Sequence, residues 1–117
     1  MKEITIYHNP RCSKSRQALQ LLRDNSVEPK IIEYLKNPLQ KNELKKISDM
    51  LGLRPKEFIR KNEKDFKENN LIEFIENDEK IIKAMVFYPK IIERPIVTKG
   101  AIAVIGRPPE NVLEVLK

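Results

Sequence analysis

Short apolar runs at both ends of the chain alternate with longer amphipathic stretches, a pattern that predicts strands and helices in turn. Residues 3–8 alternate apolar and polar side chains, as a half-buried strand does. From Ser13 to about Asp24 the apolar positions recur at helical spacing, and Lys30–Leu35 is a second β-prone run. A right-handed crossover would therefore place the two strands side by side and parallel.

The middle of the chain has a purely helical pattern. Apolar residues at helical spacing predict helices over Gln40–Leu51, Leu71–Glu76 and Asp78–Phe87. Gly52 follows the first of these, at the C-terminal position that glycine favours. We therefore expect an all-helical insertion at about residues 40–88.

The last quarter of the chain returns to a strand pattern. Two β-prone runs, Pro95–Thr98 and Ala101–Ile105, flank a short Lys-Gly turn and predict a hairpin. Two prolines at 108 and 109 then favour the start of a final helix. The order βαβ, helices, ββα predicts one α/β domain spanning residues 1–117.

Composition and charge argue against a nucleic-acid-binding protein and against a membrane-spanning one. The net charge is +6, and 34% of the 117 residues are charged, with 16 lysines among the 23 basic residues. Basic and acidic side chains are interspersed rather than blocked, and no aromatic-plus-basic signature is present, so we expect no nucleic-acid partner. No apolar run approaches the roughly 18 residues of a membrane span. We expect a cytoplasmic monomer with no membrane partner.

Cysteine and histidine each occur once. One cysteine excludes an internal disulfide, and one histidine argues against a zinc site, so we expect no metal and no bound cofactor. The single thiol also fits a reducing compartment. Any redox cycle at this thiol needs a second thiol from another molecule.

Cys12 stands between the first predicted strand and the first predicted helix. The N–H groups of a helix's first turn have no partner within the helix and favour an anion. Thiols at such places have pKa values lowered from about 8.5 to roughly 3.5–7.5. A lone cysteine is more often a small buried apolar residue, but the polar neighbours of Cys12 favour a reactive thiolate.

Three neighbouring features refine this interpretation. Ser15 stands where a dithiol oxidoreductase carries its second cysteine, and its hydroxyl can donate to a thiolate or to a bound oxygen. The tyrosine-phosphatase loop needs arginine six positions after its cysteine, where this chain has Ala18. His8 is either a structural hydrogen-bonding group or a support for the thiolate, and the sequence leaves both readings open. Arg94 and Arg107 each precede a proline, which restricts their backbone and suits them to bind oxyanions.

Taken together, these residues resemble the glutaredoxin-dependent arsenate reductases of the ArsC type. The resemblance extends over nearly the whole chain and rests on five segments that occur in the family's order and spacing. These segments are Ile6–Cys12, Leu35–Pro38, Phe58–Asn62, Glu93–Val97 and Gly106–Glu110. It implies a thioredoxin/glutaredoxin-like fold with a helical insertion and a cis peptide bond before Pro95.

The resemblance also implies roles for single residues. Cys12 would be the nucleophile that attacks arsenic, and His8 would support its thiolate. Arg60, Arg94 and Arg107 match the family's oxyanion-binding arginines, and Ser15 matches a nearby polar contact. Arsenate would be the substrate, with glutathione as co-substrate and glutaredoxin as partner.

The expected function is therefore an oxidoreductase of arsenic detoxification that reduces arsenate to arsenite. Two alternatives share the fold. One is a regulatory or binding protein like the Spx-type regulators, although those usually carry a Cys-x-x-Cys switch that Ser15 replaces here. The other is a thiol oxidoreductase acting on a different substrate, such as a glutathione mixed disulfide.

Overall fold

The computed structural model describes residues 3–117 and divides the chain into two compact units. The sheet unit contains the residues up to Asn37 together with Arg94–Lys117. The helical unit is the intervening segment Pro38–Glu93. The helical insertion expected at about 40–88 thus corresponds to a slightly longer segment, and each unit is described by itself below.

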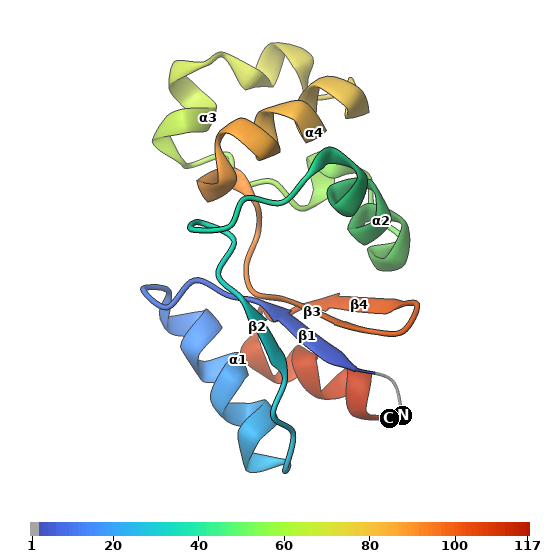
Figure 1. The fold of residues 1–117 in the computed structure, drawn as a ribbon. Coiled ribbons are helices and arrows are strands. Elements are labelled where there is room, and N and C mark those ends of the chain that lie inside the picture. Colours follow the sequence, from blue (N-terminus) through green and yellow to red (C-terminus); the bar gives the residue numbers. More distant parts are fainter. Residues whose placement is uncertain (1–2) are drawn as a thin grey trace. The chain divides into compact units, whose positions relative to one another are not determined.

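The sheet unit contains one four-stranded mixed sheet with the strand order β2-β1-β3-β4. The strands are β1 (Ile4–Tyr7), β2 (Lys30–Ile32), β3 (Ile96–Lys99) and β4 (Ile102–Ile105). The pair β1 and β2 is parallel, whereas β3 runs antiparallel to both β1 and β4 (Figure 1). The predicted α/β class, the parallel crossover and the C-terminal hairpin are confirmed.

Two helical segments cover one face of this sheet (Figure 1). Helix α1 (Ser13–Asp24) has the predicted bounds, because its apolar positions fall on one side. The C-terminal segment Pro109–Leu116 is a 3-10 helix that packs against α1. The buried core between helices and sheet consists of Ile6, Ala18, Leu19, Leu22, Val97, Val112 and Val115.

Strand β2 is shorter than the predicted run Lys30–Leu35. It ends at Ile32 because the backbone then turns: the N–H groups of Lys36 and Asn37 both donate to the carbonyl of Glu33, at 3.0 and 2.9 Å. The apolar residues after the strand therefore belong to a turn. β-Propensity alone does not distinguish residues of a strand from apolar residues of the turn that follows it.

The helical unit contains three α-helices and three 3-10 segments. They are α2 (Lys41–Leu51), Pro55–Glu57, α3 (Lys64–Glu68), Leu71–Phe74, α4 (Asp78–Phe87) and Pro89–Ile91. Helices α2 and α4 match the prediction and pack against each other. Gly52 ends α2 with φ +68°, a left-handed conformation that glycine adopts without steric cost. The 3-10 form of Leu71–Phe74 and the short helix α3 differ from the prediction.

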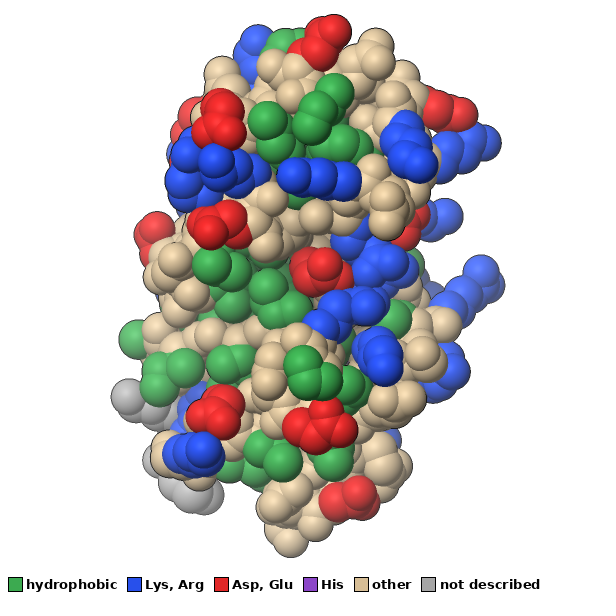
Figure 2. Space-filling model, turned by 180° about the vertical axis from the view of Figure 1, so that it is seen from behind, with side chains coloured by type: hydrophobic (Ala, Val, Ile, Leu, Met, Phe, Trp, Pro, Cys, Tyr) green, Lys and Arg blue, Asp and Glu red, His purple; other side chains and the backbone are tan. Residues whose placement is uncertain are grey.

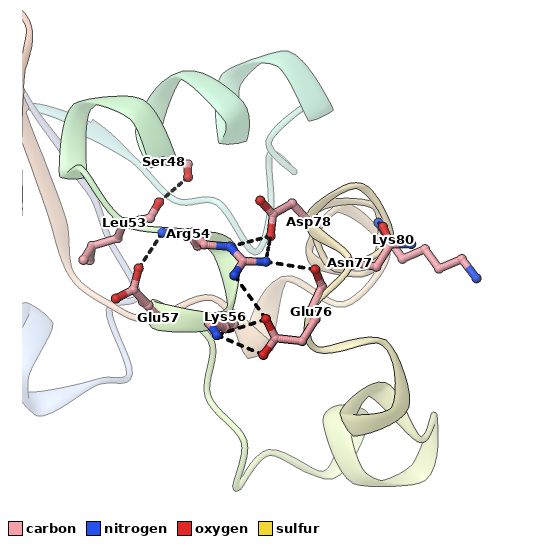
Figure 3. A network of polar contacts seen from close by, with 9 residues as sticks. All are labelled: Ser48, Leu53, Arg54, Lys56, Glu57, Glu76, Asn77, Asp78 and Lys80. Carbon is pink, nitrogen blue, oxygen red and sulfur yellow. Dashed lines mark hydrogen bonds and ion pairs between the residues drawn. The ribbon is translucent and has the colours of Figure 1, made fainter.

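An ion-pair network joins Arg54 and Lys56, at the first 3-10 segment, to Glu76 and Asp78, at the N-terminal end of α4 (Figure 3). The guanidinium of Arg54 contacts Glu76 at 3.1 Å and Asp78 at 3.0 Å, and Lys56 contacts Glu76 at 2.9 Å. Exposed pairs of this kind contribute little singly but more as a network. Figure 2 likewise shows basic and acidic side chains interspersed over one face of the molecule.

Within residues 3–117, no helix combines the length and the apolar character needed to cross a lipid bilayer.

Candidate active site

Cys12 is the N-cap residue of α1 and is half-buried. Its backbone is extended, with φ −90° and ψ 122°, and its N–H donates to the carbonyl of Asn9 at 3.0 Å. The chain thus leaves β1, makes a tight turn and enters the helix at the sulfur-bearing residue. This geometry places the thiol at the positive end of the helix dipole, as the sequence predicts.

Arg107 lies beside the sulfur. Its Nη2 atom is 3.6 Å from Cys12 Sγ, and its Nε donates to the backbone carbonyl of Arg94 at 2.8 Å. The Arg94 side chain also hydrogen-bonds the Cys12 sulfur. The two arginines selected from the sequence therefore meet at the candidate nucleophile.

A close approach of two backbone segments fixes these arginines. The N–H of Gly106 donates to the carbonyl of Pro95 at 2.8 Å, and a Cβ at Gly106 would lie 2.7 Å from Pro95 Cγ. Only glycine fits at that separation without a shift of the ring. The Arg94-Pro95 peptide bond is cis, as the resemblance implies, and so is Arg107-Pro108.

The surroundings of Cys12 lower the pKa of its thiol. Burial alone would raise this pKa, but hydrogen bonds from the N–H of Ser15, the Arg94 side chain and the N–H of Lys14 outweigh burial. Each of these donors stabilises the charged form. The site therefore favours a thiolate, and Arg107 adds a further guanidinium at its edge.

His8 and Ser15 form a buried pair behind the loop that carries Cys12. Ser15 is 0% exposed and His8 is 6% exposed. The Nδ1 atom of His8 lies 2.6 Å from Ser15 Oγ, and the same hydroxyl accepts the N–H of Asn9 at 3.1 Å. The Ser15 hydroxyl thus makes both of these contacts within the protein, and its predicted contact with a bound oxyanion stays a prediction.

The pKa of His8 is lowered. Burial is the largest cause, Glu33 opposes it, and the positive charges of Arg23 and Arg16 add to it. A lowered pKa keeps the imidazole neutral near neutral pH. The predicted support of the Cys12 thiolate by His8 stays a prediction.

Arg60 belongs to the helical unit. Its guanidinium contacts Glu63 at 3.3 Å and Glu93 at 3.0 Å, and its backbone N–H donates to the carbonyl of Ile91 at 2.7 Å. Burial acts to lower the pKa of Arg60, but the two carboxylates raise it overall. Its predicted contact with an oxyanion stays a prediction.

Sequence reasoning missed Asn9. This buried residue accepts the N–H of Arg11 through its side chain at 3.0 Å and the N–H of Cys12 through its carbonyl at 3.0 Å. The signal was present, because asparagine before a Pro-x pair often closes such a turn. Asn9 shapes the loop that presents the thiol.

A thiolate with two guanidinium groups beside it is suited to nucleophilic attack on a tetrahedral oxyanion. The thiolate is a nucleophile, and arginine donors bind and stabilise the oxygens of a tetrahedral anion. Within residues 3–117, no three His, Cys, Asp or Glu side chains gather in a group that could hold a metal ion.

Comparison with known proteins agrees with this geometry. Residues 7–115 match the ArsC family. The chain is 47% identical to the uncharacterized protein YfgD of Escherichia coli K12 over 98% of both chains. It is 40% identical to an arsenate reductase of the same organism, over 99% of this chain and 82% of that protein.

A solved structure gives the same result. The arsenate reductase from Vibrio cholerae superimposes with a TM-score of 0.93 and 43% identity, covering 97% of this chain and 98% of that one. Together with the observed sheet, this likeness confirms the predicted thioredoxin-like fold. The chain belongs to the ArsC family.

Proposed function

We propose that this protein reduces arsenate to arsenite, with Cys12 as the nucleophile and with glutathione and glutaredoxin as the external reductants. One observation carries the proposal: the sulfur of Cys12 lies at the N-terminus of α1 and interacts with the side chains of both Arg94 and Arg107. Relatives named as arsenate reductases support the choice of substrate.

Binding comes first. Arsenate is a tetrahedral anion, so it suits the first-turn N–H groups of α1 and the guanidinium groups of Arg94 and Arg107. Arg60, the third arginine implied by the family resemblance, would contribute a further contact. The positive groups also stabilise the charge that builds on the arsenic-bound oxygens during attack.

The Cys12 thiolate then attacks arsenic. A sulfur–arsenic bond forms, and one oxygen leaves as water after taking protons from solvent, so arsenic stays pentavalent. The thiol of glutathione forms a second sulfur–arsenic bond in the same way, again with loss of water.

Reduction follows in the next step. A glutaredoxin thiolate attacks the glutathione sulfur and forms a mixed disulfide. The electron pair of the broken sulfur–arsenic bond passes to arsenic, which becomes trivalent while still bound to Cys12. Water then displaces the Cys12 sulfur, which releases arsenite and restores the thiolate.

The need for outside thiols follows from the composition. Cys12 is the only cysteine of the chain, so the two reducing electrons come from another molecule. Glutathione and glutaredoxin are the thiols that the family resemblance implies. Such a cycle requires a reducing compartment, so we propose that the enzyme is cytoplasmic. We also propose that it works as a monomer.

A coupled assay tests the proposal. NADPH oxidation with glutathione, glutathione reductase and glutaredoxin should depend on arsenate and should vanish in Cys12→Ser. Removing one oxyanion donor typically costs about 10²–10³-fold in rate, so Arg94→Ala and Arg107→Ala should lose that much. Arg54→Ala is the matched control, because Arg54 is exposed and pairs with Glu76 and Asp78 within the helical unit.

The same assay tests Arg60 and the substrate. Arg60→Ala should weaken arsenate binding, whereas Arg54→Ala removes an exposed arginine from the same unit and should not. A higher rate with a glutathione mixed disulfide than with arsenate would instead identify a thiol oxidoreductase of another specificity. Turnover of arsenate by Cys12→Ser would refute the proposed mechanism.

A further inference from the structure

The positive charge of the chain is divided unevenly between its two units. In the sequence, the sheet unit carries 11 basic and 6 acidic residues, whereas the helical unit carries 12 and 11. Five of the six net positive charges therefore belong to the unit that contains Cys12. The function proposed above uses Arg94 and Arg107 from that unit and leaves the rest of the surplus unexplained.

The two longest stretches without an acidic residue both lie in the sheet unit, and both reach the thiol. They are residues 4–23, which include Cys12, and residues 94–109, which include Arg94 and Arg107. A carboxylate beside the sulfur would repel an anion, whereas basic side chains attract one. The distribution of charge therefore favours an anionic partner at the thiol.

Three exposed basic side chains lie within four residues of Cys12 along the chain. They are those of Arg11, Lys14 and Arg16. Arg16 Nη1 donates to the backbone carbonyl of Pro10 at 3.0 Å, which places this guanidinium against the loop that carries the thiol. In the part of the chain that the structure describes, no carboxylate forms an ion pair with any of the three, and the first turn of α1 has no acidic side chain. Their charges are therefore available to a partner.

We propose that Arg11, Lys14 and Arg16 form a carboxylate-binding surface that recognises glutathione as the thiol co-substrate. Glutathione is a small tripeptide with a carboxylate at each end and its thiol between them. To form a bond to arsenic on Cys12, its sulfur must come next to the Cys12 sulfur, so its carboxylates come near side chains a few residues away. The inference deepens the function proposed above and rests on it.

Glutathione fits this surface better than a protein thiol does. In the proposed cycle glutathione bonds to arsenic itself, whereas glutaredoxin attacks the glutathione sulfur and stays one step farther from Cys12. Guanidinium and ammonium groups pair with carboxylates, but each exposed pair is weak. Several weak pairs select the charge of a partner and speed its approach more than they tighten its binding.

Thiol–disulfide exchange tests the surface without arsenate. The Cys12 thiolate attacks a disulfide, forms a mixed disulfide with one half and releases the other half as a thiolate. Glutathione disulfide is an anion, whereas bis(hydroxyethyl) disulfide is neutral. The ratio of the two rate constants measures recognition of the carboxylates, because a change in the Cys12 thiol itself affects both rates.

Arg11→Gln and Lys14→Gln each remove one charge and keep the backbone unchanged. Each should lower the ratio by about 2–5-fold, as expected for one exposed ion pair, and the double variant should lower it further. Lys30→Gln is the matched control, because Lys30 is also exposed and belongs to the same unit. Lys30 lies opposite Thr5 in the sheet, before the chain reaches the loop of Cys12, so its loss should leave the ratio unchanged.

Salt and steady-state kinetics give two further measurements. Raising the ionic strength from about 0.01 M to about 0.15 M shortens the Debye length from about 30 Å to about 8 Å. In the wild type, the rate with glutathione disulfide should then fall more steeply than the rate with the neutral disulfide. In the coupled arsenate assay, the double variant should raise the KM for glutathione by about the factor that the ratio loses, with the KM for glutaredoxin unchanged.

Three results would overturn the assignment. One is a wild-type ratio in the double variant. Another is an equal loss in Lys30→Gln, which would mean that net charge acts from any position of the unit. The third is a raised KM for glutaredoxin with an unchanged KM for glutathione, which would assign the surface to the protein thiol. Failure of the proposed function gives a different result: a wild-type protein that selects the anionic disulfide but does not turn over arsenate.

Discussion

The Nη2 atom of Arg107 lies 3.6 Å from the sulfur of Cys12, although 95 residues separate the two in sequence. The same guanidinium donates through Nε to the carbonyl of Arg94 at 2.8 Å. One planar group thus links the hairpin end of the sheet to the thiol at the start of α1. Arginine can make these two contacts at once because its donors form a rigid fork.

Arg107→Lys tests whether the two simultaneous contacts of the guanidinium group are needed. Lysine keeps the positive charge but is a point charge that cannot reach both partners in the same way. We expect arsenate turnover to fall by about 10–100-fold, with the larger change in kcat/KM. Steady-state kinetics over a range of arsenate concentrations measures it, and wild-type kinetics in Arg107→Lys would show that charge alone suffices.

Gly106→Ala tests how the close backbone approach at position 106 positions Arg107. A Cβ at position 106 would lie 2.7 Å from Pro95 Cγ, so the ring or the backbone must move. Overpacking of this kind costs about 1–3 kcal/mol. We expect a loss of unfolding free energy together with slower alkylation of Cys12, because the displaced segment carries Arg107.

Gly52→Ala is the control for that experiment. At Gly52 a Cβ meets nothing within 4 Å, but φ is +68°, so alanine is strained by about 1–2 kcal/mol. It should lower the unfolding free energy, measured by denaturant titration, without changing the rate of Cys12 alkylation. If both variants alter the thiol equally, general loss of stability explains the effect of Gly106→Ala.

The sequence predicts the elements that have a strong periodic pattern and a clear boundary. Helix α1 begins and ends as predicted because its apolar face is regular and Cys12 precedes it in an extended conformation. Helix α3 was missed, since its short, charged sequence Lys-Asp-Phe-Lys-Glu has no apolar stripe beyond Phe66. A final helix was predicted from Pro108 and Pro109 onward, and the segment Pro109–Leu116 is helical but in the 3-10 form, which the apolar pattern does not distinguish from an α-helix.

The candidate site was predictable only as far as residue type and local order allow. The position of Cys12 before a helix is visible in the sequence, and so are the X-Pro pairs that hold Arg94 and Arg107. The contact of Ser15 with His8 depends on burial, which no local pattern reveals. Likewise, nothing near Arg60 in sequence indicates its ion pair with Glu93, 33 residues away.

The helical unit has a carboxylate with a strongly shifted titration. Lys41 and Lys45 contact Glu79 at 2.5 and 2.6 Å and lower its pKa to about 2. Since this pKa is lower in the folded than in the unfolded chain, the stabilisation is complete above the ordinary carboxyl pKa and is lost as pH falls toward about 2.

Glu79→Gln removes this pH dependence. We expect the variant to lose stability near neutral pH but to resemble the wild type in acid, as measured by denaturant unfolding at several pH values. The group is exposed, so salt at about 1 M, where the Debye length is about 3 Å, should reduce the difference. A Glu79 carboxyl that titrates at its ordinary pKa by NMR would contradict the ion pairs.

The most direct test of the account is the pH profile of Cys12 alkylation with and without arsenate. A stabilised thiolate predicts a midpoint below the ordinary thiol value of about 8.5, so alkylation persists as the pH falls below it. Arsenate should then slow alkylation by occupying the same positive groups. A midpoint at the ordinary value, together with a rate that arsenate does not change, would contradict a thiolate at an oxyanion site.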